Sequence, residues 1–127
     1  MPIVGAVSGK PIGLFDSGMG GLTVALALSQ QLPLERIVYL GDTARVPYGT
    51  KSPDTVVKYA RRNMEFMRRH DVKAVVVACN TVSAQGIDSF TQACDPLVLG
   101  VIEPGAKMAC ETTKSGKVGV LATPGTV

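Results

Sequence analysis

The stretch Ala74-Val-Val-Val-Ala-Cys79-Asn80-Thr81 joins a run of apolar residues to a thiol and two small hydrogen-bonding side chains. The five residues before Cys79 predict a short buried strand, because strands of parallel sheets read as continuous apolar runs. Cys79 then falls at the carboxyl end of the strand, where open α/β sheets bind their ligands. A thiol beside the N–H groups of a helix start can be held as a reactive thiolate. The stretch therefore predicts cysteine chemistry on a small polar substrate.

The same order of strand and helix recurs along the chain. Strands are predicted at residues 12–15, 37–40, 74–78, 97–102 and 118–122, and helices at residues 20–32, from Ser52 onward, at 84–94 and at 104–113. Ser52-Pro53-Asp54 has the residues of an N-cap, a first-turn proline and a first-turn acid. Strands that alternate with helices imply parallel pairing and right-handed crossovers. The predicted fold is a doubly wound, mainly parallel α/β sheet with helices on both faces, truncated after its last strand.

Composition narrows the class of protein. The 127 residues, 46% of them hydrophobic, are enough for one compact domain with its own core. The net charge of +3 is too weak and too scattered to predict nucleic-acid binding. No apolar run approaches the roughly 18 residues of a membrane span. The first twelve residues lack the features of a signal peptide, and three cysteines without a CxxC pair indicate reduced thiols in the cytoplasm.

Each predicted strand is followed by a polar residue, and a sheet of this kind brings these positions to one edge. They are Asp16, Asp42, Cys79, Glu103 and Thr123. For Asp42 and Glu103 the favoured interpretation is a loop start or a helix cap. Asp16-Ser17 and Cys79-Asn80-Thr81 differ, because each pairs a possible acid or base with neighbours that can bind a carboxylate.

Two other kinds of site are poorly supported. Gly18-Met-Gly20-Gly21 lacks the lysine of a P-loop and the spacing of a dinucleotide motif, so it predicts a sharp turn beside Asp16. One histidine and dispersed cysteines give no metal-ligand spacing. His70 is expected to end a helix, where a cation suits the helix dipole.

Cys79 is the one candidate nucleophile or base. Cys94 and Cys110 are predicted on apolar helix faces as inert small hydrophobes. No histidine lies near Cys79 in sequence, so a Cys–His hydrolase is poorly supported. Proton abstraction by a thiolate, assisted by Asp16, is the favoured chemistry.

Five ordered segments resemble those of the glutamate racemases, which belong to the cofactor-independent aspartate/glutamate racemase family. They are residues 13–22, 40–49, 77–84, 101–105 and 119–126, and the match runs from about residue 12 to the end. The resemblance implies interconversion of L- and D-glutamate without cofactor or metal, in the cytoplasm, supplying D-glutamate for peptidoglycan. It also implies a homodimer for the full-length enzyme, with no nucleic-acid or membrane partner.

The resemblance further implies roles for individual residues. In a two-base mechanism one cysteine removes the Cα proton and a second, on the opposite face, returns one. Cys79 matches the first cysteine, and Asp16 matches the carboxylate thought to assist it. The substrate-binding pairs correspond to Asp16-Ser17, Tyr48-Gly49 and Asn80-Thr81, and Thr123 and Thr126 belong to a motif that lines the same cleft.

The chain departs from the family in length. Family members are about twice as long, and their second cysteine lies in a Gly-Cys-Thr-His motif that these 127 residues lack. The resemblance implies an N-terminal extension at residues 1–11, a first α/β domain at 12–114 with one half of the active site, and the first strand of a second domain at 115–127. The missing C-terminal half is then a required partner, and we expect the chain alone not to racemise glutamate.

Three alternatives stay open from the sequence. The chain could belong to a related amino-acid racemase, to a cysteine-dependent amidase, or to a non-catalytic module that binds dicarboxylic amino acids. Exchange of the Cα proton with solvent deuterium separates them, because a racemase incorporates deuterium, an amidase releases ammonia, and a binding module does neither.

Overall fold

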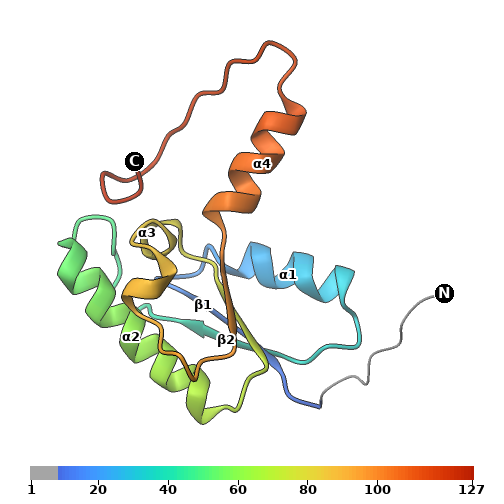
Figure 1. The fold of residues 1–127 in the computed structure, drawn as a ribbon, viewed down its shortest axis with the longest axis vertical. Helices are drawn as coiled ribbons and strands as arrows, with labels where there is room; N and C mark the ends of the chain where they lie inside the picture. The colour runs from blue at the N-terminus through green and yellow to red at the C-terminus, as the bar shows by residue number, and fades with distance from the viewer. Residues whose placement is uncertain (1–8) are drawn as a thin grey trace.

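The computed structural model of the protein describes residues 9–127, so most of the predicted extension at 1–11 lies outside the described residues. The elements alternate between strand and helix for most of the chain (Figure 1). In order they are β1 (Ile12–Asp16), α1 (Leu22–Gln31), β2 (Ile37–Gly41), α2 (Pro53–Arg69), β3 (Ala74–Val77), α3 (Asn80–Ser83), the 3₁₀ helix η1 (Ile87–Ser89), β4 (Leu97–Gly100) and α4 (Ile102–Thr112).

The four strands form one parallel sheet in the order β2-β1-β3-β4. β1 is central, with Ile12 opposite Ile37 on one side and Ala74 on the other. The connections from β1 to β2 and from β2 to β3 run in opposite directions across the sheet. Right-handed crossovers therefore place α1 and α2 on opposite faces, as Figure 1 shows. The predicted α/β class is confirmed, and the strand order reverses between β1 and β3.

The main core lies between α2 and the sheet. Phe15 of β1 and Val75 and Val77 of β3 are fully buried on this face. The α2 residues that pack against them are Val56, Ala60, Met64 and Met67. The predicted start of α2 is confirmed, because Pro53 is its first residue and the Ser52 hydroxyl accepts a hydrogen bond from the Thr55 N–H at 3.4 Å. An amphipathic helix with a defined cap thus covers one face of the sheet.

The opposite face is only partly covered. α1 has no buried residue, and Leu97 and Leu99 of β4 are 64% and 51% exposed. α4 points away from the sheet, and the chain after it returns toward α3 (Figure 1). Among the described residues, no helix is long and apolar enough to span a bilayer.

Two predicted elements are wrong. The helix expected at residues 84–94 does not form: α3 ends before it, at Ser83, and the expected range contains the short η1 instead. Gly86 lies between them with φ of 82°, a left-handed conformation that interrupts a helix. The strand expected at residues 118–122 does not form. Val118, Val120 and Leu121 are exposed there, and an extended segment without a neighbouring strand has no ladder of hydrogen bonds.

Candidate active site

The carboxyl ends of β1 and β3 bring Cys79 to Ser17. The Ala78 N–H still bonds the Phe15 carbonyl at 2.9 Å, which keeps the two strand ends side by side. One residue further, the Cys79 thiol donates to the Ser17 hydroxyl at 3.4 Å, and Cys79 is only 5% exposed. This is the position where the strand order reverses, which is where open α/β sheets bind ligands. The predicted approach of Asp16-Ser17 to Cys79 is therefore present.

Backbone amides hold the Asp16 carboxylate. It accepts hydrogen bonds from the Ser17 N–H at 2.7 Å and from the Gly21 N–H at 2.8 Å, at the turn that leads into α1. A Cβ on Gly21 would lie 2.7 Å from the Asp16 Cβ, so the turn requires glycine. The pKa of Tyr39 is raised, first by burial and then by the negative charge of Asp16. Asp16 is thus a fixed, buried charge beside the Cys79–Ser17 pair.

Three threonine hydroxyls form a second group at this edge, here called the threonine cluster (Thr81, Thr123 and Thr126). The hydroxyl of Thr81 lies 3.1 Å from that of Thr123 and 3.4 Å from that of Thr126, and the latter two are 3.1 Å apart. The Gln85 amide donates to the carbonyls of Thr81 and Gly125 at 3.3 and 3.2 Å. These bonds fasten the turn at residues 123–126 onto α3, two residues from Cys79.

Tyr48-Gly49 joins the threonine cluster through its glycine. A Cβ on Gly49 would lie 2.5 Å from Cγ2 of Thr123, so the two backbones approach closely. The Tyr48 ring is 1% exposed, and its hydroxyl donates to the Asp42 carboxylate and accepts from the Asn63 amide at 3.2 Å. Burial, and then the bond to Asp42, raise the pKa of Tyr48. The side chain of Tyr48 is therefore directed into the protein.

Sequence comparison assigns the chain to a family. Residues 22–127 match the family model described as Asp/Glu/Hydantoin racemase. The chain belongs to this family. It is 55% identical over 119 residues to the glutamate racemase of Chlorobaculum parvum, a match that covers 93% of the chain and 44% of that protein. The chain therefore spans less than half the length of this relative.

Structural comparison agrees with the assignment. The glutamate racemase of Aquifex pyrophilus superposes with a TM-score of 0.87 at 46% identity, over 92% of the chain and 46% of that structure. The glutamate racemase of Francisella tularensis in complex with D-glutamate superposes with a TM-score of 0.82 at 44% identity, over 93% and 44%. The predicted resemblance is confirmed for the fold and the family.

Within this Asp/Glu racemase domain, the other predicted polar positions are more dispersed. Asn80 begins α3 next to Cys79 and is exposed, whereas Glu103 lies in the exposed first turn of α4. His70 is the C-cap of α2, as predicted, with Nδ1 2.9 Å from the Phe66 carbonyl. Among the described residues, no group of three or more His, Cys, Asp or Glu side chains is arranged to hold a metal ion.

The prediction for the other two cysteines is wrong. Cys94 and Cys110 are both exposed, and Cys94 lies outside any helix because the expected helix ends early. Cys110 is on α4, which does not pack its apolar residues against the sheet. Neither thiol is therefore a buried hydrophobe, and exposure alone favours their labelling over that of Cys79.

Sequence reasoning missed Asn63 and assigned Asp42 to a loop start. Asn63 is 2% exposed on the buried face of α2, and Asp42 is 8% exposed directly after β2. One signal was present: Asn63 lies three residues after Ala60 and seven after Val56, on the apolar face of the helix. A polar residue on such a face needs a buried partner.

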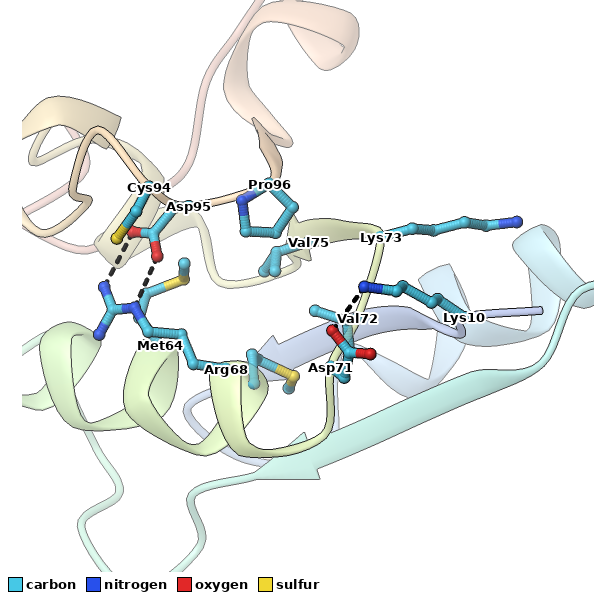
Figure 2. A pocket seen from close by; sticks show the side chains of 11 residues that line it. Lys10, Met64, Arg68, Asp71, Val72, Lys73, Val75, Cys94, Asp95 and Pro96 are labelled. Carbon is cyan, nitrogen blue, oxygen red and sulfur yellow. Dashed lines mark hydrogen bonds and ion pairs between the residues drawn. The ribbon is translucent and has the colours of Figure 1, made fainter. Parts of the chain in front are cut away.

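A cavity of about 490 Å³ lies at the opposite edge of the sheet (Figure 2). It is lined by the C-terminal half of α2 and the amino ends of β3 and β4. Nε and Nη2 of Arg68 donate to Asp95 at 2.6 and 2.8 Å, and Lys10 pairs with Asp71 at 2.7 Å. The Arg68–Asp95 pair clips α2 to the segment before β4, and the Lys10–Asp71 pair joins the segment before β1 to the turn after α2, so these charges are structural. Cys79 lies at the other end of β3.

Proposed function

We propose that the chain forms one half of a glutamate racemase active site, with Cys79 as the acid or base on one face of the substrate Cα. The observation that carries the proposal is the Cys79 thiol, 3.4 Å from Ser17, at the point where the strand order of a racemase-family sheet reverses. L- and D-glutamate are the proposed substrates, and the D-glutamate complex of the Francisella tularensis relative supports this choice.

The chemistry needs an unusual base and a strong anion-binding site. The α-proton of an amino acid is a very weak acid, so charge that develops on the carboxylate must be stabilised by preorganised donors. We propose that Asn80, the threonine cluster, the Ser17 hydroxyl and the backbone at Gly49 supply these donors. Cys79, which is nearly excluded from water, then accepts or delivers the proton on its own face.

Inversion requires a second acid or base on the opposite face of Cα. We propose that the C-terminal half found in the longer relatives supplies it, and that Asp16 assists Cys79 by handling a proton or by holding the substrate ammonium during proton transfer. We also propose, from the family resemblance alone, that the full-length enzyme supplies D-glutamate for peptidoglycan, in the cytoplasm and as a homodimer. The chain alone lacks the second group and should not racemise glutamate.

A chimera tests the proposal, with this chain in place of the matching part of the Chlorobaculum parvum relative. In D₂O, proton NMR should show loss of the glutamate Hα signal, and circular dichroism should show racemisation. Cys79→Ser should lower kcat by about 10²–10⁴-fold, since a general acid–base group is lost. Cys110→Ser, at the exposed thiol of α4, is the matched control and should leave kcat unchanged.

The same assay separates the alternatives. With glutamine as the substrate, release of ammonia without deuterium incorporation would indicate an amidase, and glutamate binding without either would indicate a binding module. Racemisation by the 127-residue chain alone, lost in Cys79→Ser, would show that one cysteine suffices and would overturn the two-base account.

A further inference from the structure

Three buried polar side chains and the partly exposed Arg45 form a network beneath the candidate site, here called the Asp42 network (Asp42, Arg45, Tyr48 and Asn63). Oδ2 of Asp42 accepts hydrogen bonds from the Tyr48 hydroxyl and from Nη1 of Arg45, the latter at 2.7 Å. The Tyr48 hydroxyl also accepts a bond from the Asn63 amide at 3.2 Å. The network therefore links the loop after β2 to the middle of α2.

Burial makes three members of this network depend on one another for hydrogen bonds. Tyr48, Asn63 and Asp42 are 1%, 2% and 8% exposed, so each polar group depends on its protein partners for hydrogen bonding. The Tyr48 hydroxyl is engaged by Asp42 and Asn63 together, and it points toward α2. A hydroxyl held in this way is not directed at a substrate in the cleft.

The Tyr48 ring also packs against a second aromatic ring. The Tyr48 and Tyr59 rings are 5.3 Å apart between centroids, and the Arg45 guanidinium lies 5.2 Å from the centroid of Tyr59. Both contacts join the loop at residues 42–51 to α2. The contact with Tyr59 and the hydrogen bonds together restrict the Tyr48 side chain, and Arg45 packs over the ring of Tyr59.

Gly49, the residue after Tyr48, connects the anchored tyrosine to the candidate site. Gly49 abuts Thr123, and Thr123 is hydrogen-bonded to Thr81, two residues after Cys79. A continuous path of contacts therefore runs from Asn63 on α2 through Tyr48 and Gly49 to the threonine cluster. A shift of Tyr48 would move Gly49 relative to Thr123.

We propose that Asp42 and Asn63 are positioning residues that hold the Tyr48-Gly49 backbone at the substrate cleft. Tyr48 acts as the anchor of this loop, and its hydroxyl serves the network instead of contacting substrate. The kinetic consequence rests on the proposed racemase function, whereas the structural consequence can be measured on the chain alone.

Hydrogen exchange on the 127-residue chain tests the anchor. Asp42→Ala and Tyr48→Phe should each accelerate amide exchange in residues 42–51 about tenfold, because each leaves a buried partner unsatisfied. The double variant should accelerate exchange by less than the product of the two single-variant factors, since both changes remove the bond between Tyr48 and Asp42. Tyr59→Phe keeps the ring beside Tyr48 and should match the wild type. Additive effects, or unchanged exchange in the single variants, would overturn the proposal.

Kinetics in the chimera tests the positioning role. Asp42→Ala and Tyr48→Phe should raise KM for glutamate by similar factors, about tenfold, with a smaller change in kcat because Cys79 is untouched. Asp42→Asn keeps the size and one acceptor oxygen, so it should fold normally and restore part of the loss. A raised KM in Tyr48→Phe alone would indicate a direct contact between the hydroxyl and substrate, and would overturn the proposal. An inactive wild-type chimera would refute the proposed function. Hydrogen exchange would still show whether Tyr48 anchors the loop at residues 42–51.

Discussion

The two faces of the sheet are packed to different extents. On the α2 face, Phe15, Val75, Val77 and the apolar stripe of α2 are buried. On the α1 face, Leu14 of the central strand is fully buried, but Leu97 and Leu99 of β4 are exposed and α1 buries no residue. The strand order explains the difference, because two successive crossovers, from β2 to β3 and from β3 to β4, fall on the α2 face and only one falls on the other. The stability of the described chain therefore comes mainly from the α2 face.

Truncation of one apolar residue on each face should give the largest difference in the free energy of unfolding. Met64 of α2 is fully buried against the sheet, whereas Leu26 of α1 is 59% exposed. Met64→Ala should lower the free energy of unfolding by about 2–5 kcal/mol through lost burial and a residual cavity. Leu26→Ala is the matched control and should change it by less than about 0.5 kcal/mol. Urea denaturation measures both, and equal losses would contradict the comparison.

Loss of the ion pair between Arg68 and Asp95 should give the next largest change in the free energy of unfolding. It clips α2 to the segment before β4, and the Asp95 side chain is 2% exposed. Hydrogen bonds from Arg68, and then one from the Gln92 N–H, lower the pKa of Asp95. Asp95→Asn should reduce the free energy of unfolding by about 1–3 kcal/mol at pH 7, since a charge-assisted pair is lost.

The pH dependence of this effect has a defined sign. A carboxyl whose pKa is lower in the folded state contributes stability above its unfolded pKa, about pH 4, and loses it as the pH falls further. The difference between wild type and Asp95→Asn should therefore shrink below about pH 4. Asp71→Asn is the control, because the pair of Asp71 with Lys10 is exposed and contributes about 0–1 kcal/mol. A difference that grows in acid would contradict the assignment.

Local patterns in the sequence were enough to predict the helix and strands that form the α2 face. The cap at Ser52-Pro53-Asp54 and the helical spacing of Val56, Ala60 and Met64 predicted α2, and the structure confirms both. The approach of Asp16-Ser17 to Cys79 also followed from the order of strands and helices, because the end of a parallel strand fixes where the next residue lies.

The predictions that were wrong depended on contacts that a local pattern does not contain. Apolar spacing from Ala84 to Cys94 suits a helix, but Gly86 adopts a left-handed conformation there. The apolar residues at 118–122 suit a strand, but a strand also needs a neighbour to pair with. The Tyr48 hydroxyl donates to Asp42 and accepts from Asn63, and these two bonds join positions up to 15 residues apart, so they became visible only in the folded chain.

The smallest predicted change in stability concerns α4, at the loosely packed C-terminal end of the molecule. A Cβ on Gly105 of α4 would meet nothing within 4 Å, whereas a Cβ on Gly13 of β1 would lie 2.7 Å from Sδ of Met67 on the α2 face. Gly105→Ala should stabilise α4 by about 0.5–1 kcal/mol, because glycine loses more backbone entropy than alanine in a helix interior.

Hydrogen exchange is the measurement for α4. A stabilisation of this size slows exchange of the α4 amides about two- to fivefold. If α4 opens independently of the sheet, the urea midpoint should stay constant while this exchange slows. Gly13→Ala should instead lower the urea midpoint, since its Cβ enters a packed face. A higher urea midpoint in Gly105→Ala would mean that α4 unfolds together with the core, and the contrast between a packed α2 face and a loosely attached C-terminal region would then fail.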